Sequence, residues 1–193
     1  MRCFSGSRPS KPSRAALILA LLAFASLPLW PQAGDNPPRI PRWSGPEPVH
    51  FCIDRTMEAY RPEVLSALWV WQRETAQLIM AETRDCFAPR TISFRLAPRI
   101  WSLGWTLYPP PLTIEPQAGD VTVNADIDWN RPEIRIQLLP VLIHEVGHAL
   151  GMGHAFIPDS VMWPNVNNRT ALSPLDRWAF RCLYGIECGT PAP

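Results

Sequence analysis

The sequence predicts an α+β domain in which a small mixed sheet with a long backing helix lies over a second, buried helix. An irregular C-terminal part that ends in a helix follows. Three observations predict this fold: short runs in which apolar and polar residues alternate, one long segment with apolar residues at helical spacing, and a segment near Pro140 that is apolar on nearly all sides of a helix. With 193 residues, 47% of them hydrophobic, the chain can form one core of ordinary size.

The N-terminal 33 residues are predicted to be a secretory signal peptide. They have a basic start, an apolar run from Ala15 to Leu27, and then small residues. Cleavage could follow Ala25 or Ala33. The apolar run is short for a membrane span, and an uncleaved anchor is the alternative. Residues 34–47 are rich in proline and are expected to form an extended linker or a short arm over the domain.

Alternating runs predict strands at Val49–Ile53, at Thr91–Leu96 and at Gly119–Asn124. Ile134–Ile136 is a candidate for a further short strand. The proline-rich stretch Tyr108–Pro116 is expected to be a loop. We expect 119–124 to be the edge strand, which could pair with an extended peptide.

A long helix is predicted between the first two strands, beginning near Pro62, a residue that suits a first helical position. Its apolar stripe is expected to pack in the core and contains Val64, Leu65, Leu68, Trp69, Gln72, Thr75, Leu78 and Ile79. The last helix is predicted to begin at Pro174, with Ser173 as its cap and Asp176 in its first turn.

The helix near Pro140 contains the motif H-E-x-x-H-x-x-G-x-x-H, from His144 to His154. On a helix, His144 and His148 project from one face one turn apart and can share a metal. Gly151 can adopt the left-handed conformation that ends a helix, so that His154 can return as a third ligand. Three neutral imidazoles around zinc leave a fourth position for water. Glu145 is then a candidate general base.

The alternative for this motif is a core helix whose histidines are hydrogen-bonded and bind nothing. Met162, eight residues after His154, favours the metal site. Together the motif and this methionine resemble the metzincin zinc endopeptidases, in which the methionine forms a hydrophobic floor beneath the histidines. The remaining histidine, His50, has no ligand spacing and is expected on a strand face.

Within the metzincins, the chain most resembles the matrixins. Met162-Trp163-Pro164 is similar to their Met-x-Pro turn, and Leu172–Gly185 is similar to their C-terminal helix. Matrixins usually carry two adjacent aspartates in that helix, whereas this chain has Leu175 and Asp176. The resemblance implies a catalytic domain at residues 48–188, followed by a tail at 189–193.

This resemblance implies an exported zinc-dependent endopeptidase that acts on polypeptides through a zinc-activated water, with Glu145 as general base. One catalytic zinc is expected, because no histidine lies between His50 and His144 to hold a second. The segment Asp120–Asp128 could hold calcium, but its spacing fits no defined calcium loop, so a solvated loop is the favoured interpretation. Walls of the substrate pocket are expected from the helix around His144 and from Pro164–Leu172.

Two other functions stay open. The chain could be a non-catalytic exported homologue that binds zinc and peptides, although the intact Glu145 argues against this reading. It could also be a zinc hydrolase that acts on a non-peptide amide.

Charge and cysteine content agree with export. Four of the 18 basic residues lie before Ala15, so signal removal leaves 14 basic and 17 acidic residues, a net charge of −3. This balance argues against nucleic acid and anionic membranes as partners, and a secreted or periplasmic monomer is expected. The cysteines that remain after Cys3 is removed with the signal are Cys52, Cys86, Cys182 and Cys188. They allow three disulfide pairings, of which we favour Cys52–Cys86 and Cys182–Cys188.

Overall fold

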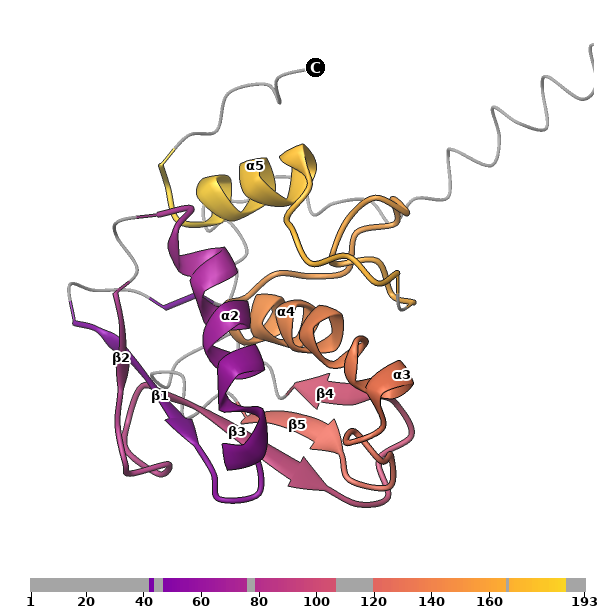
Figure 1. The fold of residues 1–193 in the computed structure, drawn as a ribbon. Coiled ribbons are helices and arrows are strands. Elements are labelled where there is room, and N and C mark those ends of the chain that lie inside the picture. Colours follow the sequence, from indigo (N-terminus) through magenta and orange to yellow (C-terminus); the bar gives the residue numbers. More distant parts are fainter. Residues whose placement is uncertain (1–41, 44–46, 76–78, 107–119, 166, 187–193) are drawn as a thin grey trace, which may run out of the picture. The chain divides into compact units, whose positions relative to one another are not determined.

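The computed structural model describes residues 42–43, 47–75, 79–106, 120–165 and 167–186. The predicted signal peptide, most of the predicted linker and Cys188 lie outside these ranges. Within them the fold is α+β, as the sequence predicts, with a mixed sheet on one side and helices packed over it (Figure 1). No helix in this described part is both long and apolar enough to cross a membrane.

The sheet has five strands in the order β2-β1-β3-β5-β4. The strands are β1 (Val49–Ile53), β2 (Met80–Glu82), β3 (Thr91–Ala97), β4 (Gly104–Thr106) and β5 (Asp120–Asn124). Strands β2, β1, β3 and β5 run parallel to one another, and β4 is antiparallel to β5. The sequence did not predict β2 and β4, because three residues are too few to show a period of two.

The edge of the sheet differs from the prediction. Strand β5 was expected at the edge but lies between β3 and β4, so that β4 is the outer strand. The Asn124 side chain, at the end of β5, donates hydrogen bonds to the backbone carbonyls of Ile100 (3.1 Å) and Ser102 (3.0 Å). These bonds hold the turn before β4 against the end of β5, and this long-range contact has no signature in a local pattern.

Helix α2 (Arg61–Gln72) packs across α4 (Leu138–Ala149). Its buried face includes Val64, Leu68 and Trp71, while the predicted core residues Leu65 and Trp69 are 40% and 60% exposed. The helix also ends well before Ile79, where the predicted stripe ends. The chain must return to the sheet there: the Ile79 carbonyl accepts a hydrogen bond from the Val49 amide at 2.8 Å, just before β2.

The predicted strand at Ile134–Ile136 is also wrong. Residues Pro132–Arg135 form a short helix, α3, and Ile136 is exposed. Pro132 takes the first helical position, where its ring presets the backbone φ angle for a helix. The Arg135 side chain donates a hydrogen bond of 2.8 Å to Glu63 of α2, and this bond joins α3 to α2.

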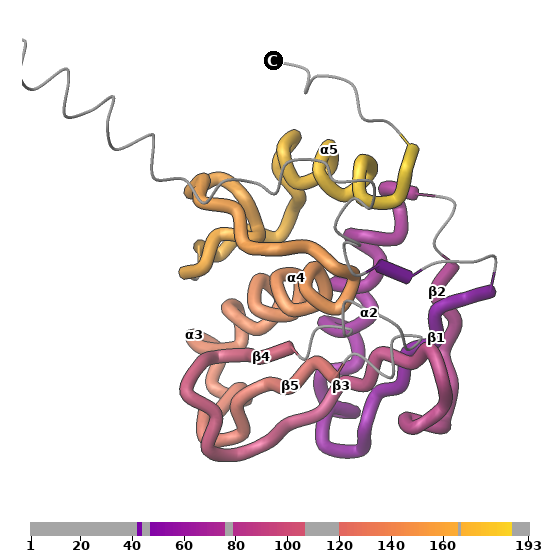
Figure 2. The backbone as a smooth tube through the Cα atoms, turned by 180° about the vertical axis from the view of Figure 1, so that it is seen from behind, coloured from indigo at the N-terminus to yellow at the C-terminus, as the bar shows by residue number. Residues whose placement is uncertain are grey.

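Helix α4 lies at the centre of the domain. In both views it lies between strands β4 and β5 on one side and α5 (Pro174–Leu183) on the other (Figures 1 and 2). Ten of its twelve residues are buried, as expected for a helix that is apolar almost all round. The Trp71 indole donates to the Ile143 carbonyl at 2.9 Å and its ring contacts Phe180, so one side chain links α2, α4 and α5.

A disulfide joins Cys52 of β1 to Cys86, with 5.0 Å between their Cα atoms. This is the first of the two favoured pairings. The second pairing needs Cys188, which lies outside the described residues, so it stays a prediction. The Cys52–Cys86 bond fastens the loop that precedes β3 to β1, an inner strand of the sheet.

Candidate metal centre

The end of helix α4 sets the direction of the chain beyond the first two histidines. Gly151 has a left-handed φ of 94°. Its amide donates to the His148 carbonyl, and the Met152 amide donates to the Gly147 carbonyl, both at 2.9 Å. This pair of bonds is the Schellman ending of a helix, which needs a residue that tolerates positive φ. The chain therefore reverses within two residues and returns toward the helix.

Two aromatic side chains complete this helix end. The Trp43 indole donates to the Ala149 carbonyl at 2.8 Å, and the Tyr184 hydroxyl donates to the Leu150 carbonyl at 3.0 Å. Both side chains are buried. Trp43 belongs to the segment predicted as linker, so this part of that segment packs in the core.

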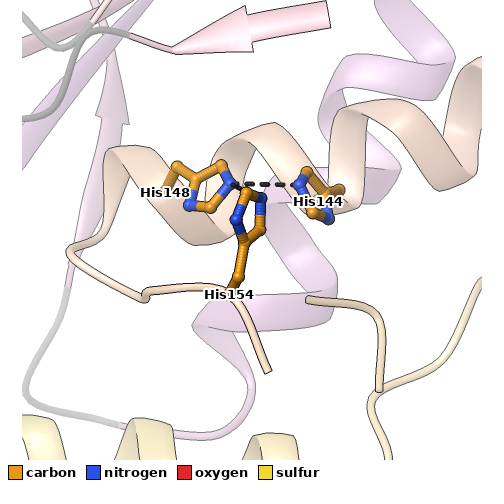
Figure 3. A group of neighbouring side chains, drawn as sticks. All are labelled: His144, His148 and His154. Atoms are coloured by element: carbon orange, nitrogen blue, oxygen red, sulfur yellow. Dashed lines mark hydrogen bonds between the residues drawn. The ribbon is translucent and has the colours of Figure 1, made fainter. Parts of the chain in front are cut away.

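The three motif histidines meet at one point (Figure 3). The Nε2 atom of His148 is 3.0 Å from that of His144 and 3.2 Å from that of His154. In the described part of the chain they are the one cluster of three or more metal-ligating side chains. His50 lies on β1, outside the cluster.

Backbone carbonyls orient two of these rings. The Nδ1 atom of His144 lies 2.8 Å from the Val161 carbonyl oxygen, and that of His148 lies 2.8 Å from the Met152 carbonyl oxygen. A carbonyl can only accept, so Nδ1 carries the proton and the Nε2 lone pairs face the common point. Tetrahedral zinc with Zn–N bonds of about 2.0–2.1 Å places its ligand nitrogens about 3.3 Å apart, which fits the observed spacing.

Burial also favours the ligand form of these histidines. It lowers the pKa of His148 to about 4 and lowers the pKa of His144 below its usual value. Both rings are therefore neutral at physiological pH, and only a neutral imidazole has a lone pair for a metal.

The turn that carries Met162 lies against this helix. Met162 is fully buried, and the Ala155 amide donates to its carbonyl at 2.9 Å. A Cβ atom at Gly147 would overlap the Met162 sulfur and lie 2.8 Å from the Trp71 ring. Gly147 thus allows helix, methionine and tryptophan to pack together, a role that its place in the motif did not reveal.

Asp176 holds this turn in place. Predicted only as a helix-start residue, it completes the capping box with Ser173 and is almost fully buried. Its carboxylate also accepts hydrogen bonds from the Ser160 hydroxyl and from the Val161 amide, the latter at 3.0 Å. Because the Val161 carbonyl orients His144, Asp176 connects the last helix to the metal cluster through one residue.

Replacing Asp176 by alanine is expected to lower the free energy of unfolding by about 3 kcal/mol, since it removes a cap and leaves buried donors unpaired. Urea denaturation at a fixed zinc concentration measures this change. The matched control is Asp159→Ala: Asp159 is mostly exposed and forms a surface ion pair with Arg169, so the expected loss is below about 1 kcal/mol. Equal losses in the two variants would contradict the anchoring role of Asp176.

Glu145 lies beside the cluster and is buried, with 6% of its surface exposed. The Thr106 hydroxyl on β4 is 2.6 Å from its Oε2 atom. Burial raises the pKa of Glu145 to about 7, and the hydrogen bond from Thr106 opposes that shift. A carboxyl group with a pKa near neutrality can both accept and return a proton.

A cleft of about 710 Å³ opens onto these side chains. It is lined by the three histidines, Glu145, strand β4 and residues 163–165. Pro164, Asn165 and Asn167 come from the segment that was expected to form a wall. The corrected edge strand, β4, also lines the cleft, through Gly104, Trp105 and Thr106.

A two-histidine helix, a glycine turn that returns a third histidine, and a buried methionine turn define the metzincin class. Residues 103–185 match the family model described as Matrixin. The chain is 30% identical over 171 residues to matrix metalloproteinase-2 of Drosophila melanogaster, which covers 79% of this chain. It is also 27% identical to stromelysin-1 of Equus caballus, in an alignment that covers 80% of this chain. To stromelysin-3 of Rattus norvegicus it is 32% identical, over 74% of this chain. The chain therefore carries a matrixin-like metzincin domain.

These relatives are longer proteins. The chain spans 22% of the Drosophila protein, 35% of the horse protein and 30% of the rat protein. The likeness accordingly concerns only part of each relative, and in this chain the residues that match the family model include the three histidines and Glu145.

Proposed function

We propose that this chain is an exported zinc-dependent endopeptidase. The observation that carries the proposal is the convergence of three histidine Nε2 atoms, two of them oriented by backbone carbonyls, next to a buried carboxyl in an open cleft. The similarity to matrix metalloproteinases and stromelysins supports a polypeptide as substrate.

In the proposed mechanism, His144, His148 and His154 hold one zinc ion. When bound, zinc acts as a Lewis acid that polarises a carbonyl group and lowers the pKa of water. Glu145 accepts the proton of the attacking water and returns it to the leaving amine. Strand β4 offers its outer backbone edge, so an extended peptide can pair with it as an added strand.

We also propose the processing and location of the chain: residues 1–33 are a signal peptide, 34–47 a short arm of which Trp43 packs in the core, and 48–188 the catalytic domain of a secreted or periplasmic enzyme. The Cys52–Cys86 disulfide supports this, because such bonds persist in oxidising compartments. The sequence favours a solvated loop over a calcium site at Asp120–Asp128, and this stays a prediction. Asp120 is engaged by Ser93 and Arg95, and Asp126 by the Arg99 amide.

Removing the metal tests the function. A zinc-loaded preparation should cleave members of a proteome-derived peptide library, and dialysis against a chelator should lower turnover by more than about 100-fold, because the Lewis acid is lost. Mass spectrometry of the products measures cleavage. One equivalent of zinc should restore it, and a hydroxamate should inhibit the restored enzyme.

Unchanged cleavage by protein shown to be metal-free would refute a zinc enzyme. Zinc binding without any turnover would instead favour the non-catalytic peptide-binding alternative.

A further inference from the structure

We infer that two residues of β4, Gly104 and Thr106, form a seat for the Glu145 carboxyl group, and that Thr106 is a positioning residue for catalysis. The inference rests on the proposed function, because it assigns a role toward the proposed general base. It adds residues that lie outside the histidine motif, one of them, Thr106, 39 positions before Glu145 in the chain.

Thr106 holds one oxygen of the carboxyl group. Its hydroxyl lies 2.6 Å from Glu145 Oε2 and 3.1 Å from the Glu145 backbone carbonyl, and its side chain is buried. A hydroxyl has a single hydrogen to donate, and the shorter contact to the carboxyl oxygen is the stronger hydrogen bond. The bond fixes the side chain of Glu145 relative to β4. With Oε2 engaged, Oε1 is the oxygen that we assign to proton transfer.

Gly104 provides the space beside that carboxyl group. A Cβ atom added to Gly104 would lie 2.8 Å from Glu145 Cγ and 2.9 Å from Oε1. Alternate residues of a strand share a face, so Gly104 and Thr106 both face α4, whereas Trp105 between them is half exposed. The seat therefore has an open position and a hydrogen-bond donor, two residues apart on one short strand.

Strand β4 can hold the seat steadily because it is itself fixed. It pairs with β5 through Gly104↔Val123 and Thr106↔Val121, and both valines are fully buried. A catalytic group on a rigid helix still has a flexible side chain, and a second element must restrict that side chain to one rotamer. A displacement of about 1 Å at a reacting group can cost about 100-fold in rate.

The test is a set of single variants, each with zinc content, circular dichroism, kcat and KM measured on one peptide substrate. Thr106→Val keeps the shape but lacks the hydroxyl, and should lower kcat about 10- to 100-fold with KM within about twofold and one zinc bound. Thr106→Ser restores the hydroxyl and should recover most of the lost kcat. Thr91→Val removes a buried hydroxyl from β3 that donates to the Pro89 carbonyl, and it serves as the matched control.

Gly104→Ala is the second variant. It tests the seat by displacing the Glu145 carboxyl group, while the Thr106 hydroxyl stays in place. The atoms that the new methyl would meet belong to side chains, Glu145 and Val141, so the domain can fold while the carboxyl group is displaced. We expect a similar loss of kcat with zinc retained.

The outcomes separate this inference from the proposed function. If the zinc-loaded wild type cleaves peptides but Thr106→Val and Gly104→Ala match its kcat, the seat is wrong and the function stands. Thr106→Ser that is as slow as a folded Thr106→Val also overturns the role of the hydroxyl. A wild type that cleaves no peptide overturns both.

Discussion

Glu145→Gln is expected to lower kcat by about 1000-fold while the protein still binds one zinc ion. Proton transfer by a positioned side chain contributes about 10²- to 10⁴-fold to a rate, and an amide cannot accept the proton of the attacking water. The substitution keeps the shape of the side chain, and its amide oxygen can still accept from Thr106. The three histidines are untouched, so the metal should remain.

Single-turnover cleavage of a fluorogenic peptide and atomic absorption of the same preparation measure the two quantities. Glu133→Gln is the matched control, because Glu133 lies on α3 in an exposed pair with Arg131 and should have no effect on kcat. Cleavage by Glu145→Gln above about a tenth of the wild-type rate would show that another group removes the proton. Loss of zinc together with activity would make Glu145 a structural residue of the site.

His148→Ala is expected to abolish zinc binding and hydrolysis together. His148 lies between the other two histidines, with its Nε2 atom about equally far from both, and without it only two ligands remain. Even the loss of an outer partner of a metal ligand costs about 10- to 100-fold in affinity, so the loss of a ligand should cost more than about 100-fold.

Competition with a chelator of known affinity measures this loss. His50→Ala tests whether the loss of zinc is specific to the histidines of the cluster. His50 lies on β1 outside the cluster, so the variant should keep one zinc ion and its activity. Circular dichroism distinguishes metal loss from unfolding, because the buried His148 side chain leaves a cavity when it is truncated. One zinc retained per folded His148→Ala chain would exclude His148 as a ligand.

The local sequence pattern predicted well those helices and strands that are long or that have clear start and stop residues. Strands β1, β3 and β5 lie where alternation places them, and α5 begins at the Ser173 cap. The predictions that were wrong concern segments whose structure is determined by contacts with distant parts of the chain. Helix α2 stops short because the chain must pair with β1, and the isoleucines near 135 lie in and just after a helical turn because Pro132 begins it.

The candidate site divides in the same way. Motif spacing predicts that His144, His148 and His154 converge and that Glu145 lies beside them, since a helix repeats every 3.6 residues and a glycine can end it. The groups that hold these side chains were not predictable: the Val161 and Met152 carbonyls, the Thr106 hydroxyl, and Asp176 behind the methionine turn. Three of these four contacts join residues at least 15 positions apart in the chain.

The order of residues alone therefore determined which chemistry the chain can carry, because ligand type and helical periodicity are local properties. The folded structure decided which strand borders the cleft and what holds the carboxyl group in place. These features depend on which distant segments pack together, and they follow from the burial of the whole core and the pairing of its strands. No window of a few residues contains that information.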